Sequence, residues 1–332
     1  MAGEPHTDAE ELVLAFLAEA GDAFVAGEAI ADKLGLTGAE VFHHVDALRA
    51  QGYRIEAIPA RGYRLAEIPD RLTALEIRPL LNTHDLGQAI HAADAVGSTN
   101  DRAKALAEEG AAHGEVVVAE AQTAGRGRRG RAWSSPPGRN VYLSVVLRPD
   151  LPPGRAPELT LVAAVAVCDA LRQAGVDAGI KWPNDLLAGG RKIAGILTEL
   201  GSDADRVSWV VVGVGVNVNA RAEDFPEELR GAATSVLLER GGPAPRALFT
   251  AALLTSLERW LDLHAEEGFE PIRDAWRERS VTLGRDVRVR GDGRELVGRA
   301  EDIDAMGALL VRTADGLERV LVGDVEQVRG AS

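Results

Sequence analysis

The stretch EVVVAEAQTAGRGRRGRAWSSPPGRNVYLSVVL, residues 115–147, places a basic loop between two apolar runs. Continuous runs of valine and other apolar residues are typical of strands that are buried on both faces of a sheet. Between them, residues 124–131 hold four arginines and three glycines. The loop therefore joins two predicted strands, and we expect a mixed α/β domain around it.

This loop has the composition of an anion-binding segment. Glycine-rich backbone offers N–H groups to a phosphate, and arginine guanidinium groups match phosphate or carboxylate oxygens. Because four like charges repel and glycine has high backbone entropy, we expect the empty loop to be mobile and an anion to order it. A solvated basic loop and an RNA contact are alternatives that the eight residues leave open.

Charge is distributed unevenly along the chain. Residues 122–148 contain six arginines and no acidic residue, although the formal net charge of the 332 residues is −14. An acidic total argues against broad coating of nucleic acid. A local basic patch in an acidic chain favours a small anionic ligand over a long polyanion.

Composition limits the class of protein. A chain of 332 residues is long enough for two or three domains. It has no apolar run of the roughly 18 residues that cross a membrane, and residues 1–12 lack the layout of a signal peptide. Cys168, the one cysteine, lies in the run LVAAVAVCDAL and is expected to be a buried helix residue. These features predict a cytoplasmic protein.

Residues 8–66 predict three helices and a hairpin. The first helix is AEELVLAFLAEA, with Leu12, Phe16 and Leu17 at helical spacing, and the second is GEAIADKL. Thr37 is placed to cap a third helix, GAEVFHHVDALRAQG. Its inner stripe is expected to consist of Val41, Val45 and Leu48.

A two-stranded wing is predicted after these helices. YRIEAIPARGYRL has alternating residues on both sides of a Pro-Ala-Arg-Gly turn. Helix–turn–helix plus a β wing is a DNA-binding layout. The candidate DNA contacts are Thr37, His43, His44 and Arg61.

The charge of this region departs from what DNA binding predicts. A DNA-reading module is usually basic, but residues 1–66 hold eleven acidic and five basic side chains. Solvated or half-packed histidines are the alternative reading of His43 and His44.

The rest of the chain divides at about residue 280. Residues 70–275 mix buried strands such as VSWVVVGVGVNVN with long helices such as PELTLVAAVAVCDALRQAG and RALFTAALLTSLERWLDLHAEEG. Residues 281–330 have short strands with a turn every 8–12 residues, which predicts a small β barrel.

Four further stretches carry polar residues that suit a binding site. KWPND at 181–185 is also explained as a turn fixed by Pro183. Lys192 follows the Gly189–Gly190 turn at the start of the strand IAGILTEL, where a lone lysine is usually solvated. GSTN at 97–100 can simply cap a helix, or hold a ligand at its N-terminus. GVGVNVN at 213–219 ends a strand, and its glycines would also admit a flat ligand.

Taken in order, these stretches resemble the biotin protein ligases. The sequence contains GSTN, AEAQTAGRGRRGRAW, KWPNDLL, RKIAGILTEL and GVGVNVN. With the winged-helix start, residues 8–330 resemble the bifunctional type that also represses the biotin operon. The resemblance implies a multidomain α+β fold: a winged helix-turn-helix domain at 1–67, a mixed α/β domain of the biotin/lipoate-ligase type at 68–279, and an SH3-like barrel at 280–332.

The resemblance also implies a reaction and partners. Biotin and ATP, which arrives with Mg²⁺, give biotinyl-5′-adenylate and pyrophosphate. Biotin is then transferred to a lysine of a biotin carboxyl carrier domain, as in acetyl-CoA carboxylase. The adenylate-bound form is expected to dimerise and bind operator DNA. No CxxC, HExxH or Walker pattern occurs, so no metal site is predicted in the chain itself.

Site residues follow by the same resemblance. Lys192 and Arg128 are the catalytic candidates. The biotin-binding set is Ser98, Thr99, Asn100, Gln122, Arg126, Gly127, Arg128 and Lys192. The ATP- and adenylate-binding set is Arg131, Asn184, Asp185 and Asn217.

Three alternatives stay open at this point. The chain could be a biotin-sensing repressor without catalysis, a ligase whose DNA-binding domain has degenerated, or a lipoate ligase, since those enzymes resemble the catalytic domain. The glycine–arginine loop together with KWPND favours biotin.

Overall fold

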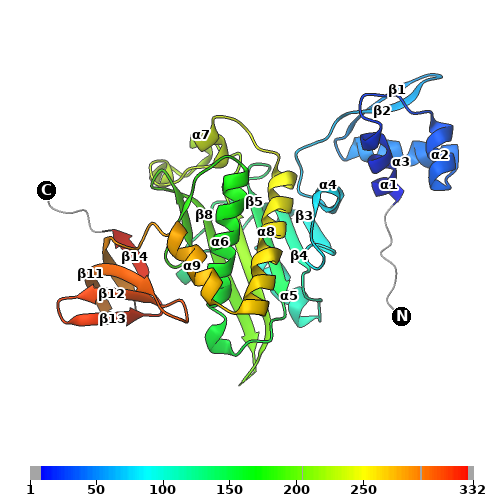
Figure 1. Ribbon diagram of the computed structural model, residues 1–332. Coiled ribbons are helices and arrows are strands. Elements are labelled where there is room, and N and C mark those ends of the chain that lie inside the picture. Colours follow the sequence, from blue (N-terminus) through cyan, green and yellow to red (C-terminus); the bar gives the residue numbers. More distant parts are fainter. Residues whose placement is uncertain (1–8, 204, 292–293, 328–332) are drawn as a thin grey trace. The chain divides into compact units, whose positions relative to one another are not determined.

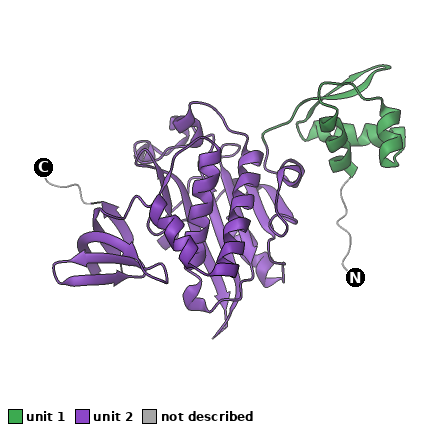
Figure 2. Cartoon of the chain, in the orientation of Figure 1, with its two compact units in different colours: residues 1–70 green, residues 71–332 purple. Residues whose placement is uncertain are grey.

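The computed structural model describes residues 9–203, 205–291 and 294–327. The chain divides into two compact units, residues 1–70 and residues 71–332 (Figure 2). In the described part, no helix is both long and apolar enough to span a membrane.

The first unit is a winged helix-turn-helix, as predicted. Its elements are α1 (Ala9–Glu19), α2 (Gly27–Leu34), α3 (Gly38–Ala50) and the antiparallel pair β1 (Arg54–Ile58) and β2 (Gly62–Glu67) (Figure 1). The α3 stripe of Val41, Val45 and Leu48 is buried, which confirms that prediction.

The first predicted helix is present as α1, and the structure shows which of its faces is buried. Val13, Leu14 and Leu17 are buried, whereas Leu12 is 40 % exposed and Phe16 is only half-buried. Of the three residues noted at helical spacing, only Leu17 is therefore fully buried. Both sets have helical spacing, and only the position of α3 against α1 selects between them.

The second unit is built on a seven-stranded mixed sheet with the order β3-β4-β5-β9-β8-β7-β6. Only β3 (Ile90–Val96) and β4 (Val116–Gln122) pair in parallel among its described strand pairs. The other strands are β5 (Val141–Leu147), β6 (Gly179–Lys181), β7 (Asp185–Ala188), β8 (Arg191–Ser202) and β9 (Val207–Val216). The expected strands at 115–122 and 141–148 are confirmed, and the one expected at 207–219 is present but ends at Val216.

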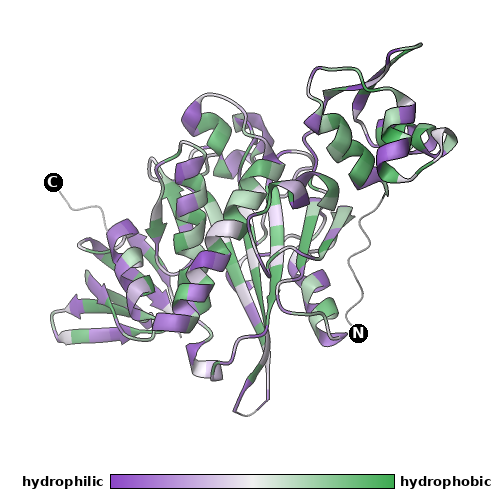
Figure 3. Cartoon of the chain, turned by 45° about the vertical axis from the view of Figure 1, so that its right-hand side comes forward, coloured by the Kyte–Doolittle hydropathy of each residue, from purple (hydrophilic) through white to green (hydrophobic). Residues whose placement is uncertain are grey.

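Helices cover both faces of this sheet (Figure 1). On one face α6 (Glu158–Gln173) and α8 (Arg246–Glu267) pack in a core that includes Val116 and Val118. On the other face α5 (Thr99–Glu108) packs against Val117 and Val211. The alternation along each strand separates these cores, and most strand residues are accordingly hydrophobic (Figure 3).

Strand β9 leaves room on the α5 face. Its even-numbered valines, from 210 to 216, enter the α6 core. The alternate positions toward α5 end in Gly213 and Gly215. A glycine at these two positions removes side-chain volume where a cavity is needed.

The C-terminal part is a five-stranded antiparallel sheet in the order β13-β12-β11-β10-β14, which agrees with the small β barrel predicted there. It follows α9 (Glu270–Arg279), which the sequence analysis did not identify. The strands are β10 (Asp286–Gly291), β11 (Arg294–Ile303), β12 (Leu309–Thr313), β13 (Gly316–Val320) and β14 (Asp324–Gln327). Asp302 of β11 accepts hydrogen bonds from Arg277 of α9 at 2.7 and 2.6 Å, which ties the strand to the helix.

Short elements complete the second unit. They are α4 (Ala74–Ile77), η1 (Arg78–Leu80), η2 (Arg128–Gly130), η3 (Pro153–Arg155), η4 (Ala222–Asp224), η5 (Glu227–Leu229) and α7 (Val236–Arg240).

Two buried side chains of the second unit matter for stability and reactivity. Arg246 of α8 is 1 % exposed, and its Nη1 lies 2.8 Å from Glu120 Oε2 at the end of β4. Cys168 lies in α6 with its thiol buried, as predicted, and burial raises its pKa to about 12.

Candidate active site

One cavity of about 600 Å³ opens on the α5 face of the sheet. This is a normal size for a small-molecule site. All twelve residues expected to bind substrate or nucleotide line it: Ser98, Thr99, Asn100, Gln122, Arg126, Gly127, Arg128, Arg131, Asn184, Asp185, Lys192 and Asn217. Residues that are more than 100 positions apart in the sequence are therefore brought together.

The N-terminus of α5 forms one end of the cavity. Ser98 takes the N-cap position, but its side chain makes no capping hydrogen bond within the described part of the chain. Gln122 of β4 performs that task, because its Oε1 accepts a hydrogen bond from Thr99 N at 2.9 Å. The Ser98 hydroxyl is therefore available to a ligand, whereas the Gln122 carbonyl is engaged.

Asn100 is held by the sheet beneath it. It is 4 % exposed, and its Nδ2 donates to Leu197 O at 3.1 Å and to Glu199 Oε2 at 2.9 Å. Its Oδ1 accepts from the buried Ser144 hydroxyl at 2.7 Å. A Cβ on Gly213 would collide with the Asn100 carboxamide. Asn100 thus supports the cavity wall with its polar atoms already satisfied by the protein.

Trp133, which the sequence analysis did not select, makes the floor. A Cβ on Gly215 would lie 2.6 Å from its Cε2, and a Cβ on Gly195 would lie 3.1 Å from its Cζ3. The glycines of GVGVNVN therefore admit a flat group, but that group is this indole ring. The Trp133 Nε1 is buried and finds no hydrogen-bond partner among the described residues.

Lys192 enters the cavity from the start of β8. Its backbone N–H donates to Ala232 O at 2.8 Å, and its carbonyl accepts from Thr234 N at 2.9 Å. Its Nζ lies 2.6 Å from Asp185 Oδ1 and 5.2 Å from the centre of the Trp133 ring. A rigid backbone therefore delivers a primary ammonium group above the floor of the site.

Two asparagines brace the segments around Lys192. Asn184 donates from Nδ2 to Ile196 O at 2.7 Å, and its Oδ1 accepts from Arg128 Nη1 at 3.3 Å. Asn217 donates from Nδ2 to Thr234 O at 3.0 Å. KWPND does form a turn, between β6 and β7, as its structural reading expects.

The basic loop at residues 124–131, called the arginine loop below, folds back on itself over the cavity. Gly127 N donates to Arg131 O at 2.7 Å, and Trp133 N donates to Gly125 O at 2.8 Å. Arg129 adopts a φ of 56°, which is uncommon for a residue with a side chain. The mobility expected of the empty loop stays a prediction.

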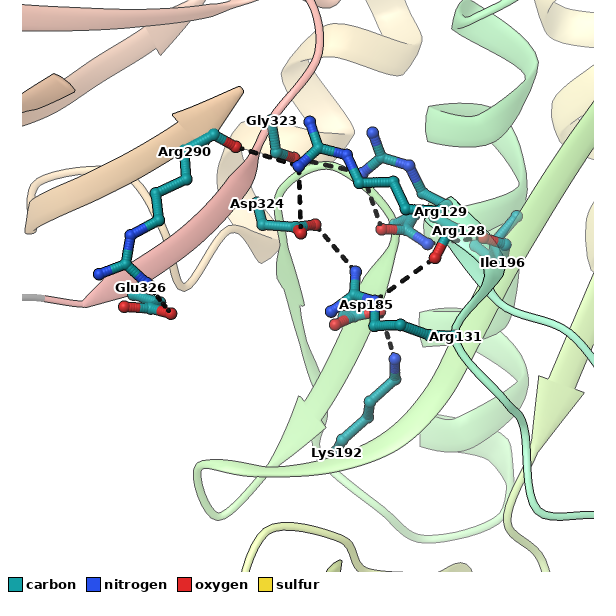
Figure 4. Close-up of polar contacts among 11 residues, drawn as sticks. Arg128, Arg129, Arg131, Asp185, Lys192, Ile196, Arg290, Gly323, Asp324 and Glu326 are labelled. Carbon is teal, nitrogen blue, oxygen red and sulfur yellow. Dashed lines mark hydrogen bonds and ion pairs between the residues drawn. The ribbon is translucent and has the colours of Figure 1, made fainter. Parts of the chain in front are cut away.

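Loop arginines contact the C-terminal sheet (Figure 4). Asp324 of β14 pairs with Arg131 at 2.8 Å and with Arg129 at 3.4 Å. Arg128 donates to Gly323 O at 3.3 Å. Burial lowers the pKa of Arg128 from its ordinary value, while the charge of Asp324 acts in the opposite direction. The C-terminal sheet thus holds the loop that lies over the cavity, although none of its described residues lines the cavity itself.

Some lining residues had weaker sequence signals. Lys181, the first residue of KWPND, also lines the cavity, as do Phe225 and Leu229. For Lys181, its position in the motif KWPND was a signal that could have identified it. The segment around Phe225 and Leu229 had none, because its sequence resembles an ordinary loop.

The candidate DNA contacts lie in the first unit. Thr37, His43 and His44 are at the N-cap of α3 or within it, and Arg61 is in the turn between β1 and β2. The side chain of Thr37 is engaged in a capping box with Glu40. His43 is exposed and His44 half-exposed. Arg61 lies 4.5 Å from the ring centre of Phe24. Phe42, which was not selected, is 48 % exposed on α3.

No group of three or more His, Cys, Asp or Glu side chains that could hold a metal ion occurs in residues 9–203, 205–291 and 294–327.

Fold and cavity together define a class of protein. An α/β domain has a cavity of small-molecule size under a basic loop, and the same chain carries a winged-helix module of the DNA-binding type and a small C-terminal β sheet. Family models match each part: the Biotin/lipoate A/B protein ligase family at residues 93–217, the Biotin protein ligase C terminal domain at 282–327, and an HTH domain at 10–64.

Individual proteins support the same assignment. The chain is 39 % identical over 315 residues to the bifunctional ligase/repressor BirA of Bacillus subtilis, covering 95 % of this chain and 97 % of that one. It is 39 % identical over 245 residues to a biotin--[acetyl-CoA-carboxylase] ligase of Mycobacterium tuberculosis, covering 70 % of this chain and 86 % of that one. A biotin protein ligase from Aquifex aeolicus, solved with biotin and ATP, has a TM-score of 0.63 at 29 % identity and covers 73 % of this chain and 99 % of that chain.

The chain therefore belongs to the biotin protein ligase family. Within that family it has the domain content of the bifunctional ligase/repressors, because the match to the Bacillus subtilis protein includes the helix-turn-helix region.

Proposed function

We propose that this chain activates biotin with ATP to biotinyl-5′-adenylate, releases pyrophosphate, and transfers biotin to a lysine of a biotin carboxyl carrier domain. The observation that carries the proposal is the convergence of the arginine loop, Lys192 and the α5 N-terminus on one cavity. The relatives named above supply biotin and ATP as the substrates. Mg²⁺ arrives with ATP and is held largely by the phosphates and water.

Biotin occupies the end of the cavity formed by Ser98, Thr99 and Gln122. The Ser98 hydroxyl and the buried Trp133 Nε1 are polar atoms that a ligand can satisfy there. The indole ring offers an apolar surface to the thioether ring and alkyl chain of biotin.

The biotin carboxylate and the α-phosphate meet near Lys192 and Arg128. Attack of a carboxylate on a phosphate brings two anions together, so the transition state needs cations at a site that excludes water. Lys192 supplies a mobile ammonium group once a substrate anion replaces Asp185. Arg126, Gly127, Arg128 and Arg131 close over the reactive anhydride, while Asn184, Asp185 and Asn217 serve the nucleotide side.

The winged-helix unit gives the chain a second proposed activity, ligand-dependent binding of operator DNA by a homodimer. We place the domain boundaries at 67/68 and 279/280 and the protein in the cytoplasm. Acetyl-CoA carboxylase or a related enzyme provides the carrier domain. His43, His44 and Arg61 are the proposed DNA contacts, and Thr37 acts mainly by capping α3.

A ligase that has lost operator binding is the second candidate. The excess of acidic over basic residues in 1–66 favours it, because DNA-binding modules are usually basic. A gel shift on the native region upstream of its own biotin genes, with and without biotin plus ATP at two salt concentrations, separates the two. A ligand-dependent, salt-sensitive shift supports repression; no shift from an active enzyme preparation supports the second candidate.

The ligase activity is tested by incubating the full chain with a carrier domain, ATP and either radiolabelled biotin or radiolabelled lipoate. We expect label on the carrier only with biotin. Labelling by lipoate alone would refute the proposal, and adenylate binding without any transfer would make the chain a sensor.

A further inference from the structure

Four charged side chains meet where the N-terminal turn of α5, the arginine loop and β8 come together. Two are acidic, Asp101 and Glu199, and two are basic, Lys104 and Arg126. Arg126 Nη2 is paired with Asp101 and lies 3.6 Å from Glu199 Oε2. Lys104 Nζ lies 3.1 Å from Glu199 Oε1. The charges of the four side chains balance.

Glu199 differs from Asp101 in what else it contacts. Its Oε2, the atom nearest Arg126, also accepts a hydrogen bond from Asn100 Nδ2 at 2.9 Å. The Glu199 side chain is 24 % exposed, and the Asp101 side chain is 53 % exposed. One oxygen therefore serves both the cavity wall and the first arginine of the loop.

Polar contacts continue from Asn100 to Thr99, at the end of the cavity where biotin is proposed to bind. The Ser144 hydroxyl donates to Asn100 Oδ1 at 2.7 Å and lies 2.9 Å from Thr99 Oγ1. Thr99 lines the cavity. An unbroken series of polar contacts thus runs from Thr99 through Ser144, Asn100 and Glu199 to Arg126.

The Glu199 carboxylate stays ionised in this position. Burial favours its neutral form, but the hydrogen bonds from Asn100 and Lys104 and the charges of Lys104 and Arg126 together outweigh burial and lower its pKa. It is a fixed negative charge, and hydrogen bonds to a charged group are about twice as strong as neutral ones.

We propose that Glu199 is a positioning residue that couples occupancy of the biotin end of the cavity to closure of the arginine loop. The inference rests on the proposed function and deepens it. Glu199 Oε2 accepts a hydrogen bond from Asn100 and lies 3.6 Å from Arg126 Nη2. A ligand that holds Thr99 in place therefore acts through Ser144 and Asn100 on the carboxylate that attracts Arg126. Biotin alone then begins to order the loop before ATP binds.

Three variants separate the two ends of this contact series. Glu199→Gln removes the charge and weakens both contacts. Asp101→Asn removes the same amount of charge from Arg126 but does not touch Asn100, so it is the matched control. Ser144→Ala disturbs Asn100 without changing any charge near Arg126.

Two readouts are measured on the full chain. The first is the KM for biotin and for ATP in biotin-dependent pyrophosphate release. The second is the rate of tryptic cleavage within residues 126–131, mapped by mass spectrometry, with and without biotin alone. In the wild type we expect biotin alone to slow cleavage.

For Glu199→Gln we expect a KM for biotin raised about tenfold, a KM for ATP changed less than twofold, and no protection of the loop by biotin. For Asp101→Asn we expect a wild-type KM for biotin, faster basal cleavage and retained protection. For Ser144→Ala we expect a raised KM for biotin with wild-type cleavage of the ligand-free loop. Glu199→Asp keeps the charge but withdraws from Asn100, so it shows the same loss of protection if Glu199→Gln does not fold.

The coupling is refuted if biotin alone leaves wild-type cleavage unchanged, or if both Glu199 variants retain protection and a wild-type KM for biotin. Failure of the proposed function gives a different result: the wild type then releases no pyrophosphate in response to biotin, and the coupling falls with it.

Discussion

Replacement of Lys192 by methionine tests the assignment of its ammonium group to the reacting anions. Its side chain is 34 % exposed, its Nζ lies 2.6 Å from Asp185, and its backbone is fixed by hydrogen bonds to Ala232 and Thr234. Methionine fits the same space above Trp133 without the charge. The fold is therefore expected to survive, and the loss falls on catalysis.

The magnitude follows from the bond that disappears. A hydrogen bond to a charged group contributes about 1.5–3 kcal/mol, which corresponds to roughly a 10- to 150-fold loss of kcat/KM. Removal of Lys192 also leaves Asp185 without this cation beside the incoming anions, which places the expected loss toward the upper end of that range.

The assay is biotin-dependent exchange of pyrophosphate into ATP, with two control variants. Lys192→Arg keeps the charge but not the compact ammonium geometry, so a smaller loss is expected. Lys33→Met removes a lysine from the winged-helix unit and leaves exchange unchanged. If Lys192→Met exchanges within threefold of the wild type while remaining folded, Lys192 does not contact the reacting anions and the reasoning fails.

Three further predictions concern the framework of the second unit. Arg246→Met leaves the Glu120 carboxylate without its buried cation, which costs about 3–5 kcal/mol. The thermal midpoint of this unit is expected to fall by about 6–20 °C, and a fall of under 2 °C contradicts the importance of the pair. The hydrogen bond from Arg277 lowers the pKa of Asp302. The stabilising effect of this pair is therefore complete above about pH 4 and is lost as the pH falls through the folded-state pKa. The difference in thermal midpoint between the wild type and Asp302→Asn should shrink between pH 5 and about pH 2, whereas a difference that grows on acidification has the wrong sign. Cys168, with a pKa of about 12, should resist iodoacetamide at about pH 8 in the native protein and react in denaturant; rapid native alkylation would show that the thiol is accessible.

The sequence predicted the elements that have strong periodicity. Apolar strands such as β9 and long helices such as α6 and α8 have few alternative structures, because burying so many valines and leucines elsewhere is costly. Short elements such as β6 and β7 depend on tertiary pairing and were predicted only as a turn. For α1, two apolar stripes compete along one helix, and the buried one depends on a surface that the helix sequence does not contain.

The candidate site shows the same limit. Its polar residues were identified because they occur in quoted motifs, but their partners were not. Trp133 becomes the floor only because Gly195 and Gly215, far away in the sequence, remove the side chains that would block it. Glu199 sits on a strand like any solvated glutamate, and its contact with Asn100 appears only when β8 lies beside α5.

Formation of biotinyl-5′-adenylate in the cavity is tested by pyrophosphate exchange, measured on the full chain in the absence of any carrier protein. Labelled pyrophosphate is supplied with ATP and Mg²⁺, and biotin, lipoate or no acid is added in parallel. We expect labelled ATP with biotin and only background in the other two reactions. Exchange that needs lipoate, or that proceeds equally without biotin, would contradict it.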